Sequence, residues 1–113
     1  MGKRESDFQS DLIDELESMF EGAIVTKLDP TFKRGIPDLL ILWNNRWATL
    51  ECKRSANASK RPHQDYYVEK MNKMSFSRFI YPENKEEVLD ELQQAFELKG
   101  NTRNVRSKSE RVA

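Results

Sequence analysis

The sequence predicts one α/β domain, a central mixed β-sheet flanked by helices, in the order helix, three strands, helix, strand, helix. Three observations favour this class. Apolar residues recur at helical spacing over about the first 20 residues, and two apolar runs of strand length follow, separated by Asn44 and Asn45. The remaining sequence alternates helical and strand patterns, which is typical of a sheet covered by helices. A chain of 113 residues is large enough for one core but not for two.

The first helix is marked by an apolar stripe that ends at Gly22, and Ser6 is its expected N-cap. The stripe consists of Phe8, Leu12, Ile13, Leu16, Met19 and Phe20. A strand is expected over residues 22–28, followed by a polar connection over residues 29–34.

The next two strands are predicted as a hairpin over residues 35–43 and 46–53. Pro37 fits just before a strand, where no hydrogen bond between strands requires its missing N–H. Its ring also restricts the backbone conformation leading to Asp38. Asp38 therefore starts one strand beside the end of its partner strand.

Side-chain alternation decides what meets Asp38 at this point. Glu51 and Lys53 are two residues apart and project from one face of their strand, whereas Leu50 and Cys52 project from the other. Two carboxylates that converge with one ammonium are expensive to bury unless a divalent cation joins them. Oxygen-rich sites of this kind suit Mg²⁺ or Mn²⁺.

The second half of the chain predicts a helix, a strand and a helix. Pro62 ends a loop rich in helix breakers and suits the first turn of a helix over residues 63–74. A strand follows over residues 76–81. The last helix opens after Pro82 and ends at Gly100. The domain is thus expected to occupy residues 1–100.

Charge is segregated along the chain although its net value is zero. Residues 5–21 hold seven acids and no Lys or Arg, whereas residues 53–73 hold six bases against two acids. Residues 101–113 hold four bases against one acid and show no apolar periodicity, which predicts a flexible basic tail. Phosphate affinity follows the local field, so the two basic regions are expected to contact DNA.

Cysteine and hydropathy limit where the protein can work. A single cysteine excludes an intrachain disulfide and suits a reducing cytoplasm. No apolar run reaches the length needed to span a bilayer, and the amino terminus lacks the apolar stretch of a signal peptide, so no membrane association is expected.

One motif resembles a known nuclease signature. Pro37-Asp38, a gap of twelve residues, and then Glu51-Cys52-Lys53 resemble the PD-(D/E)xK pattern. The resemblance implies a restriction-endonuclease-like core that cleaves DNA with Mg²⁺ or Mn²⁺. In that reading, Asp38, Glu51 and the main-chain carbonyl of Cys52 hold the metal. Lys53 orients the attacking water or stabilises negative charge, and the Cys52 side chain is buried filling.

Residues 35–39, Gly-Ile-Pro-Asp-Leu, narrow the resemblance to the VRR-NUC branch, which includes small phage-type, Holliday-junction resolvase-like nucleases. The resemblance covers roughly residues 5–96. It implies a structure-specific endonuclease, acting on branched or junction DNA in a bacterial or phage-infected cell. Two alternatives stay open: a nuclease of the same fold that acts on flaps, single strands or duplex, and a non-catalytic DNA-binding module.

A third acidic ligand is expected from the first helix. At 100° per residue, Glu5 and Gln9 fall in the middle of the apolar stripe, and Glu15 falls at its edge. In related resolvases an acid on this helix completes the site, which favours Glu5 with Gln9 in support. Whether Glu5, Gln9 or Glu15 completes the site stays open, as does the number of metals.

Other residues are expected near the phosphates. Gln64 resembles the glutamine that follows the ExK strand in VRR-NUC proteins, which would place it near the scissile phosphate. His63 is a surface or phosphate contact in preference to a general base. The expected DNA-binding residues are Arg34, Arg54, Lys60, Arg61, His63, Lys70 and Lys73.

A homodimer is expected because a four-way junction needs two symmetric cuts and this small domain holds one site. The hairpin tip and the helix over residues 63–74 also carry more large apolar residues than one core needs. These residues are Trp43, Trp47, Tyr66, Tyr67, Met71 and Met74.

Overall fold

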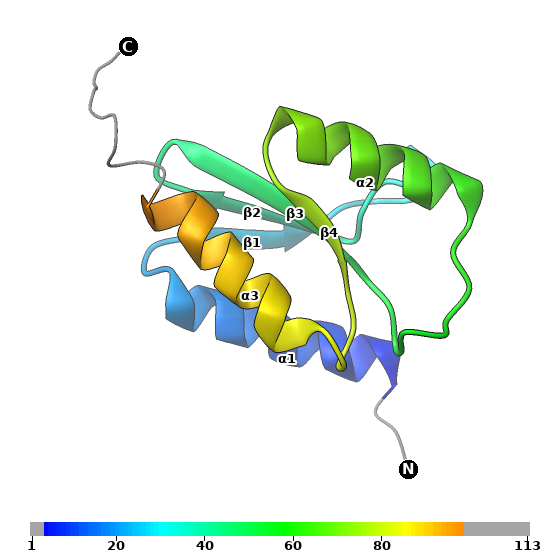
Figure 1. The fold of residues 1–113 in the computed structure, drawn as a ribbon, viewed down its shortest axis with the longest axis horizontal. Coiled ribbons are helices and arrows are strands. Elements are labelled where there is room, and N and C mark those ends of the chain that lie inside the picture. The colour runs from blue at the N-terminus through cyan, green and yellow to red at the C-terminus, as the bar shows by residue number, and fades with distance from the viewer. Residues whose placement is uncertain (1–3, 99–113) are drawn as a thin grey trace.

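A computed structural model describes residues 4–98, which form one four-stranded mixed sheet with helices packed against it (Figure 1). The predicted α/β class and element order are confirmed. The elements are α1 Glu5–Met19, β1 Ile24–Lys27, β2 Leu39–Trp43, β3 Arg46–Cys52, α2 Pro62–Met74, β4 Ser77–Ile80, α3 Lys85–Gln93 and the π-helical turn η1 Gln94–Leu98. The predicted helix end at Gly100 and the predicted tail over residues 101–113 lie outside the described residues.

The sheet order is β1-β2-β3-β4. The first three strands form an antiparallel meander, and β4 lies parallel to β3 because α2 carries the chain back along the sheet. Trp43 pairs with Arg46, so the predicted two-residue turn closes the β2–β3 hairpin. Its first residue, Asn44, has a φ of 56°, a conformation that asparagine tolerates better than most residues.

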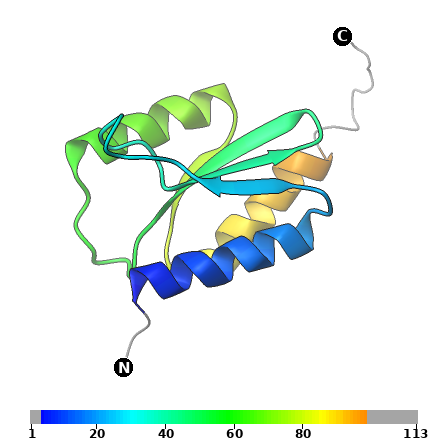
Figure 2. The same cartoon turned by 180° about the vertical axis from the view of Figure 1, so that it is seen from behind.

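The helices divide between the two faces of the sheet. Both views show α1 and α3 together on one face and α2 on the other (Figure 1 and Figure 2). The main core lies between the sheet and the α1–α3 layer. Its buried residues are Phe8, Leu12, Leu16, Phe20, Leu39, Ile41, Ala48, Leu50, Cys52, Phe76, Ile80, Val88, Leu89, Leu92 and Phe96. Within residues 4–98, no helix is both long and apolar enough to cross a membrane.

The start of α1 differs from the expectation. Ser6 is not the N-cap, because the N–H of Phe8 already donates to the Arg4 carbonyl over 3.0 Å and the helix begins at Glu5. Arg4 occupies the cap position and pairs with Asp7 at 3.3 Å.

Trp43, expected at an interface, is partly buried and packs against the core of its own domain. Its ring lies 5.1 Å from Phe20 and stacks on Phe96 at 5.9 Å between centroids. Its Nε1–H donates to the Glu21 carbonyl over 3.0 Å. The indole therefore joins α1, the hairpin and η1, and one small core does use this large aromatic residue.

Candidate active site

The hairpin register brings Asp38 to the end of β3. Leu39 pairs with Leu50, so Asp38, one residue before β2, lies beside the Glu51–Cys52 step. The Cys52 N–H donates to Asp38 Oδ2 over 2.9 Å, which holds the carboxylate in place. The Asp38 carbonyl accepts the N–H of Leu28, so the connection from β1 is anchored at the same residue.

Glu51 in β3 and Lys53, one residue past the end of β3, project to the same side, as alternation predicted. Lys53 Nζ lies 3.9 Å from Glu51 Oε2, and both residues are buried. The Cys52 side chain points the other way and is completely buried in the core, as expected. Burial also raises the pKa of its thiol, so the thiol stays protonated at neutral pH.

Gln64, in the first turn of α2, links these two charges. Its Nε2 donates to Glu51 Oε2 over 2.6 Å, while its Oε1 accepts from Lys53 Nζ over 2.7 Å. Oε1 also accepts the N–H of Arg61 over 3.1 Å. Because two donors face one end of the amide and a carboxylate faces the other, the orientation of the amide is determined by its partners.

The main chain of the loop before α2 contributes a further contact. Lys53 Nζ donates to the carbonyl of Ser59 over 3.0 Å. The ammonium is therefore held between a loop carbonyl, the Gln64 amide and the Glu51 carboxylate. No sequence pattern pointed to Ser59, since any residue type can supply a carbonyl.

These side chains line one open cleft of about 500 Å³. It gathers Asp38, Glu51, Lys53, Gln64 and Glu5. Of the expected DNA-binding residues, Arg34, Arg61 and His63 also line it. The cleft therefore brings together residues from α1, the connection to β2, β3 and α2.

Gly35 allows the close approach that shapes one wall of this cleft. Its φ is 87°, and a Cβ at this position would lie 2.4 Å from the Cβ of His63. Only glycine accepts both the left-handed backbone and this contact without strain. The connection carrying Arg34 consequently packs directly against the start of α2.

The remaining predicted bases lie elsewhere. Arg54, Lys60, Lys70 and Lys73 do not line this cleft. Lys60 lies over the Phe79 ring at 4.5 Å, and Lys70 lies 5.9 Å from the ring centroid of Tyr66. These four side chains lie outside the cleft that holds the two carboxylates.

Burial dominates the electrostatics of the site. The pKa of Glu51 is raised to about 8, chiefly by burial and also by the neighbouring Asp38 carboxylate, while the Lys53 ammonium acts in the opposite direction. Burial likewise raises the pKa of Asp38, against the hydrogen bond from Cys52. Glu51 Oε1 is buried and has no hydrogen-bond partner among the described residues. The protein alone therefore leaves Glu51 poorly compensated as an anion.

No family model matches this chain, and no match is found among the curated proteins or the solved structures.

The donor set fits Mg²⁺. No three Asp, Glu, His or Cys side chains within residues 4–98 are grouped closely enough to form a complete cation cage. Mg²⁺ does not require one, since it keeps several waters and is held through one or two carboxylates plus substrate phosphates. Asp38 and Glu51 supply two such carboxylates, and Glu51 Oε1 is an oxygen without a partner. The main-chain carbonyl of Cys52, the residue between Glu51 and Lys53, stays the predicted further ligand.

The candidates on α1 separate in space. Glu5 is exposed at the rim of the cleft, and its charge contributes to the raised pKa values of Asp38 and Glu51. Glu15 instead pairs with Lys85 at 2.8 Å and lines another cavity. Gln9 is partly buried and does not line the cleft. Of the three, Glu5 alone faces the two carboxylates.

Proposed function

We propose that the protein is a Mg²⁺-dependent endodeoxyribonuclease that hydrolyses phosphodiester bonds in branched DNA, including Holliday junctions. The observation that carries this proposal is the convergence of Asp38, Glu51 and Lys53 in one cleft, with a buried Glu51 oxygen left without a partner. Mn²⁺ has the same preference for oxygen ligands and is the expected substitute.

Asp38 and Glu51 would hold the cation, and the negative charge of Glu5 at the rim of the cleft would add to its attraction. Bound Mg²⁺ supplies charge neutralisation at the scissile phosphate and a more acidic water. The sequence resemblance to PD-(D/E)xK nucleases and the α/β order of the fold agree with this assignment.

Lys53 is the buried cation beside the two carboxylates, and it can act on the reacting phosphate. Its Nζ is held by Ser59 and Gln64, so its position does not depend on substrate. A fixed ammonium stabilises charge that develops on a phosphoryl oxygen, or orients the attacking water. Gln64 is a positioning residue that sets the distance between Lys53 and Glu51.

Variants of the three residues test the proposal. We expect Asp38→Asn, Glu51→Gln and Lys53→Ala each to lower the cleavage rate by about 10²-fold or more. Affinity for DNA should change little, because it comes from dispersed phosphate contacts. Glu17→Gln, an exposed acid on α1, is the matched control and should cleave like the wild type. Substantial Mg²⁺-dependent cleavage by Glu51→Gln would remove the proposed site.

Substrate and assembly belong to the same proposal. A junction-resolving enzyme should be a homodimer in the cytoplasm of a bacterial or phage-infected cell, with two sites related by a two-fold axis. Tyr66 and Met74 on α2 are 56% and 65% exposed, and an interface would cover them.

Light scattering should show a dimer, and a four-way junction should be cut faster than duplex of the same sequence. A monomer that cuts both equally would favour a nuclease of broader substrate range, and DNA binding without cleavage would favour a non-catalytic module.

A further inference from the structure

Phe32 is the most exposed large apolar side chain within residues 4–98, with 84% of its surface open to water. It lies in residues 29–36, which we call the β1–β2 loop and which pass beside the start of α2 (Figure 1 and Figure 2). A single exposed apolar residue is ordinary on a protein surface. The inference therefore depends on where this ring is held and on what surrounds it.

Hydrogen bonds within the β1–β2 loop shape the backbone on both sides of the ring. Asp29 Oδ1 accepts from the N–H of Thr31 over 2.9 Å and from its hydroxyl over 2.6 Å. The Asp29 carbonyl accepts the N–H of Phe32 over 3.4 Å. After the ring, the Lys33 carbonyl accepts the N–H of Ile36 over 3.2 Å. A ring on a backbone braced in this way loses little conformational freedom when it binds a ligand.

The β1–β2 loop places Phe32 at the rim of the proposed active site. Thr31 and Arg34, on either side of it in sequence, line the cleft that holds Asp38 and Glu51. Since consecutive Cα atoms are about 3.8 Å apart, the backbone of Phe32 lies within one residue of the cleft wall. Its side chain does not line the cleft and is exposed, so it projects into the solvent beside the cleft. DNA with one phosphate in the cleft has to continue through this space.

The charges around the ring attract phosphate. The β1–β2 loop holds two bases, Lys33 and Arg34, against one acid, Asp29, whose carboxylate accepts two hydrogen bonds from Thr31. Both bases are exposed, and within the described part of the chain neither forms an ion pair. Lys33 Nζ lies 5.8 Å from the centroid of the Phe32 ring. An aromatic face beside free cations is the combination that binds unpaired nucleotides, through the base and its phosphates.

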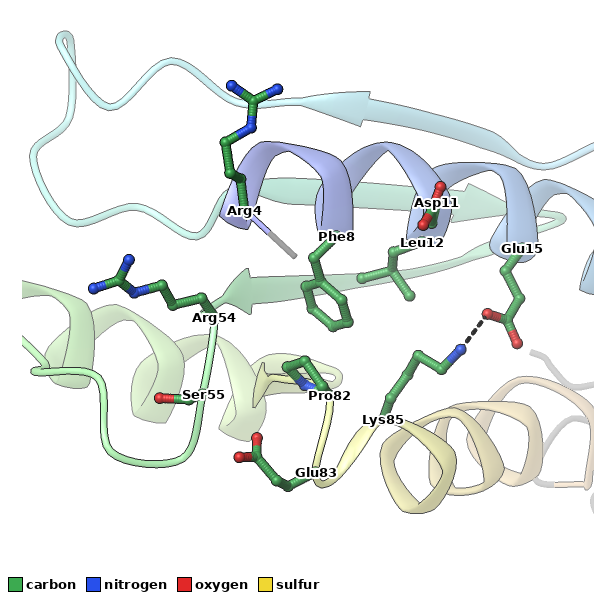
Figure 3. Close-up of a pocket in the computed structure, with 10 residues that line it drawn as sticks. All are labelled: Arg4, Phe8, Asp11, Leu12, Glu15, Arg54, Ser55, Pro82, Glu83 and Lys85. Atoms are coloured by element: carbon green, nitrogen blue, oxygen red, sulfur yellow. Dashed lines mark hydrogen bonds and ion pairs between the residues drawn. The ribbon is translucent and has the colours of Figure 1, made fainter. Parts of the chain in front are cut away.

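Other phenylalanine rings near the ends of the strands are already used by the protein. Phe8 points from α1 toward Pro82 and is only 6% exposed (Figure 3). Phe79 is covered by Lys60, whose Nζ lies 4.5 Å from the ring centroid. Within residues 4–98, Phe32 packs against no other ring. Its face is therefore available to a ligand.

We propose that Phe32 is a specificity-determining residue that stacks on a base left open where a DNA duplex is interrupted, next to the phosphate in the cleft. The inference rests on the proposed nuclease function. Stacking on an aromatic ring tolerates any base, whereas paired bases inside a continuous duplex offer no open face. Lys33 and Arg34 contact the flanking phosphates. The ring thereby favours branched, gapped or bulged DNA over intact duplex.

Binding measured without cleavage tests this role. Every protein carries Glu51→Gln and is assayed in EDTA by fluorescence anisotropy, with an intact duplex and with the same duplex carrying one unpaired thymidine. Phe32→Ala and Phe32→Leu should each weaken binding to the interrupted duplex about tenfold, and to the intact duplex by about twofold or less. Phe32→Trp keeps an aromatic face and should retain the preference for the interrupted duplex.

Two control variants separate stacking from charge and from general apolar contact. Lys33→Ala should weaken binding to both duplexes by the same factor, because a phosphate contact does not sense base pairing. Ile24→Ala removes an exposed apolar side chain of β1 outside the cleft and should change neither affinity. Urea unfolding should be unchanged in the Phe32 variants, since the ring is outside the core.

A photochemical crosslink locates the stacked base directly. With 5-iododeoxyuridine in the unpaired position, irradiation should join that nucleotide to Phe32, as identified by mass spectrometry of the digested complex. The Phe32→Leu protein should give little of this product, because the coupling requires an aromatic ring against the base.

Three results would overturn the inference, each in a different way. If the wild type cleaves DNA with Mg²⁺ while Phe32→Ala weakens binding to both duplexes equally or to neither, the nuclease function stands and the stacking role does not exist. If Phe32→Ala converts a dimer to a monomer in light scattering, the ring belongs to an interface between copies. If the protein neither binds nor cleaves DNA, the proposed function fails and this inference fails with it.

Discussion

Neutralising Glu51 should change the pH dependence of stability in a direction that the structure determines. The carboxyl is buried at the end of β3, and one of its oxygens has no partner among residues 4–98. Glu51→Gln keeps the shape of the side chain and its ability to accept from Gln64, while removing the charge. The variant therefore isolates the cost of ionising this group inside the fold.

The magnitude follows from linkage between protonation and folding. The pKa of the Glu51 carboxyl is ordinarily 4.5, and burial raises it to about 8 in the folded protein. Between pH 4.5 and pH 8 the folded protein binds a proton that the unfolded chain has lost. The free energy of unfolding is therefore highest, as far as this group is concerned, below pH 4.5, and it falls as the pH rises toward 8. Full linkage would cost about 5 kcal/mol at the upper end, and screening by water in the open cleft reduces this to about 2 kcal/mol.

Urea unfolding at pH 5 and pH 8 in EDTA measures this effect. Asp38, whose pKa is also raised, titrates in both proteins, so the difference between wild type and variant reports the ionisation of Glu51 together with its repulsion of Asp38. We expect Glu51→Gln to be more stable than wild type at pH 8 by about 2 kcal/mol, and nearly equal at pH 5. Mg²⁺ should close the gap at pH 8 by stabilising only the wild type. The exposed Glu17→Gln serves as control, and parallel pH curves for wild type and Glu51→Gln would refute the reasoning.

Three further predictions concern the framework of the site. Gln64→Ala removes hydrogen bonds to two charged groups and should lower the free energy of unfolding, measured in urea, by about 2 kcal/mol. In steady-state cleavage the same variant should change kcat more than KM. Gly35→Ala forces a Cβ to within 2.4 Å of His63 and should lower the melting temperature, whereas alanine at Gly22, with nothing within 4 Å, costs only backbone strain. Trp43→Ala should cost about 3 kcal/mol by urea unfolding, because the indole packs against Phe20 and Phe96.

Much of the site could be predicted from local sequence because it depends on strand alternation. In a strand the side-chain period is two residues, so Glu51 and Lys53 had to share a face and Cys52 had to oppose them. A two-residue turn at Asn44 then fixed the register that places Asp38 beside them. These relations involve neighbours within one hairpin, and the structure confirms this geometry.

Contacts between distant elements could not be predicted in this way. Gln64 reaches Glu51 and Lys53 only because α2 packs its first turn against the end of β3. Helical phase placed Glu15 at the edge of the apolar stripe, but not beside Lys85, which lies 70 residues away in sequence. Similarly, the count of bases in residues 53–73 did not reveal that Arg61 faces the cleft while Lys60 covers Phe79. Tertiary packing decides each of these positions.

The most direct test of the central claim is nicking of supercoiled plasmid by the purified protein, first in EDTA and then after addition of Mg²⁺. Wild type should convert the plasmid to nicked and linear forms only with Mg²⁺ or Mn²⁺. Glu51→Gln should leave it supercoiled under all conditions while still binding DNA. Equal nicking by the two proteins, or nicking that persists in EDTA, would contradict a metal-dependent site built on Asp38, Glu51 and Lys53.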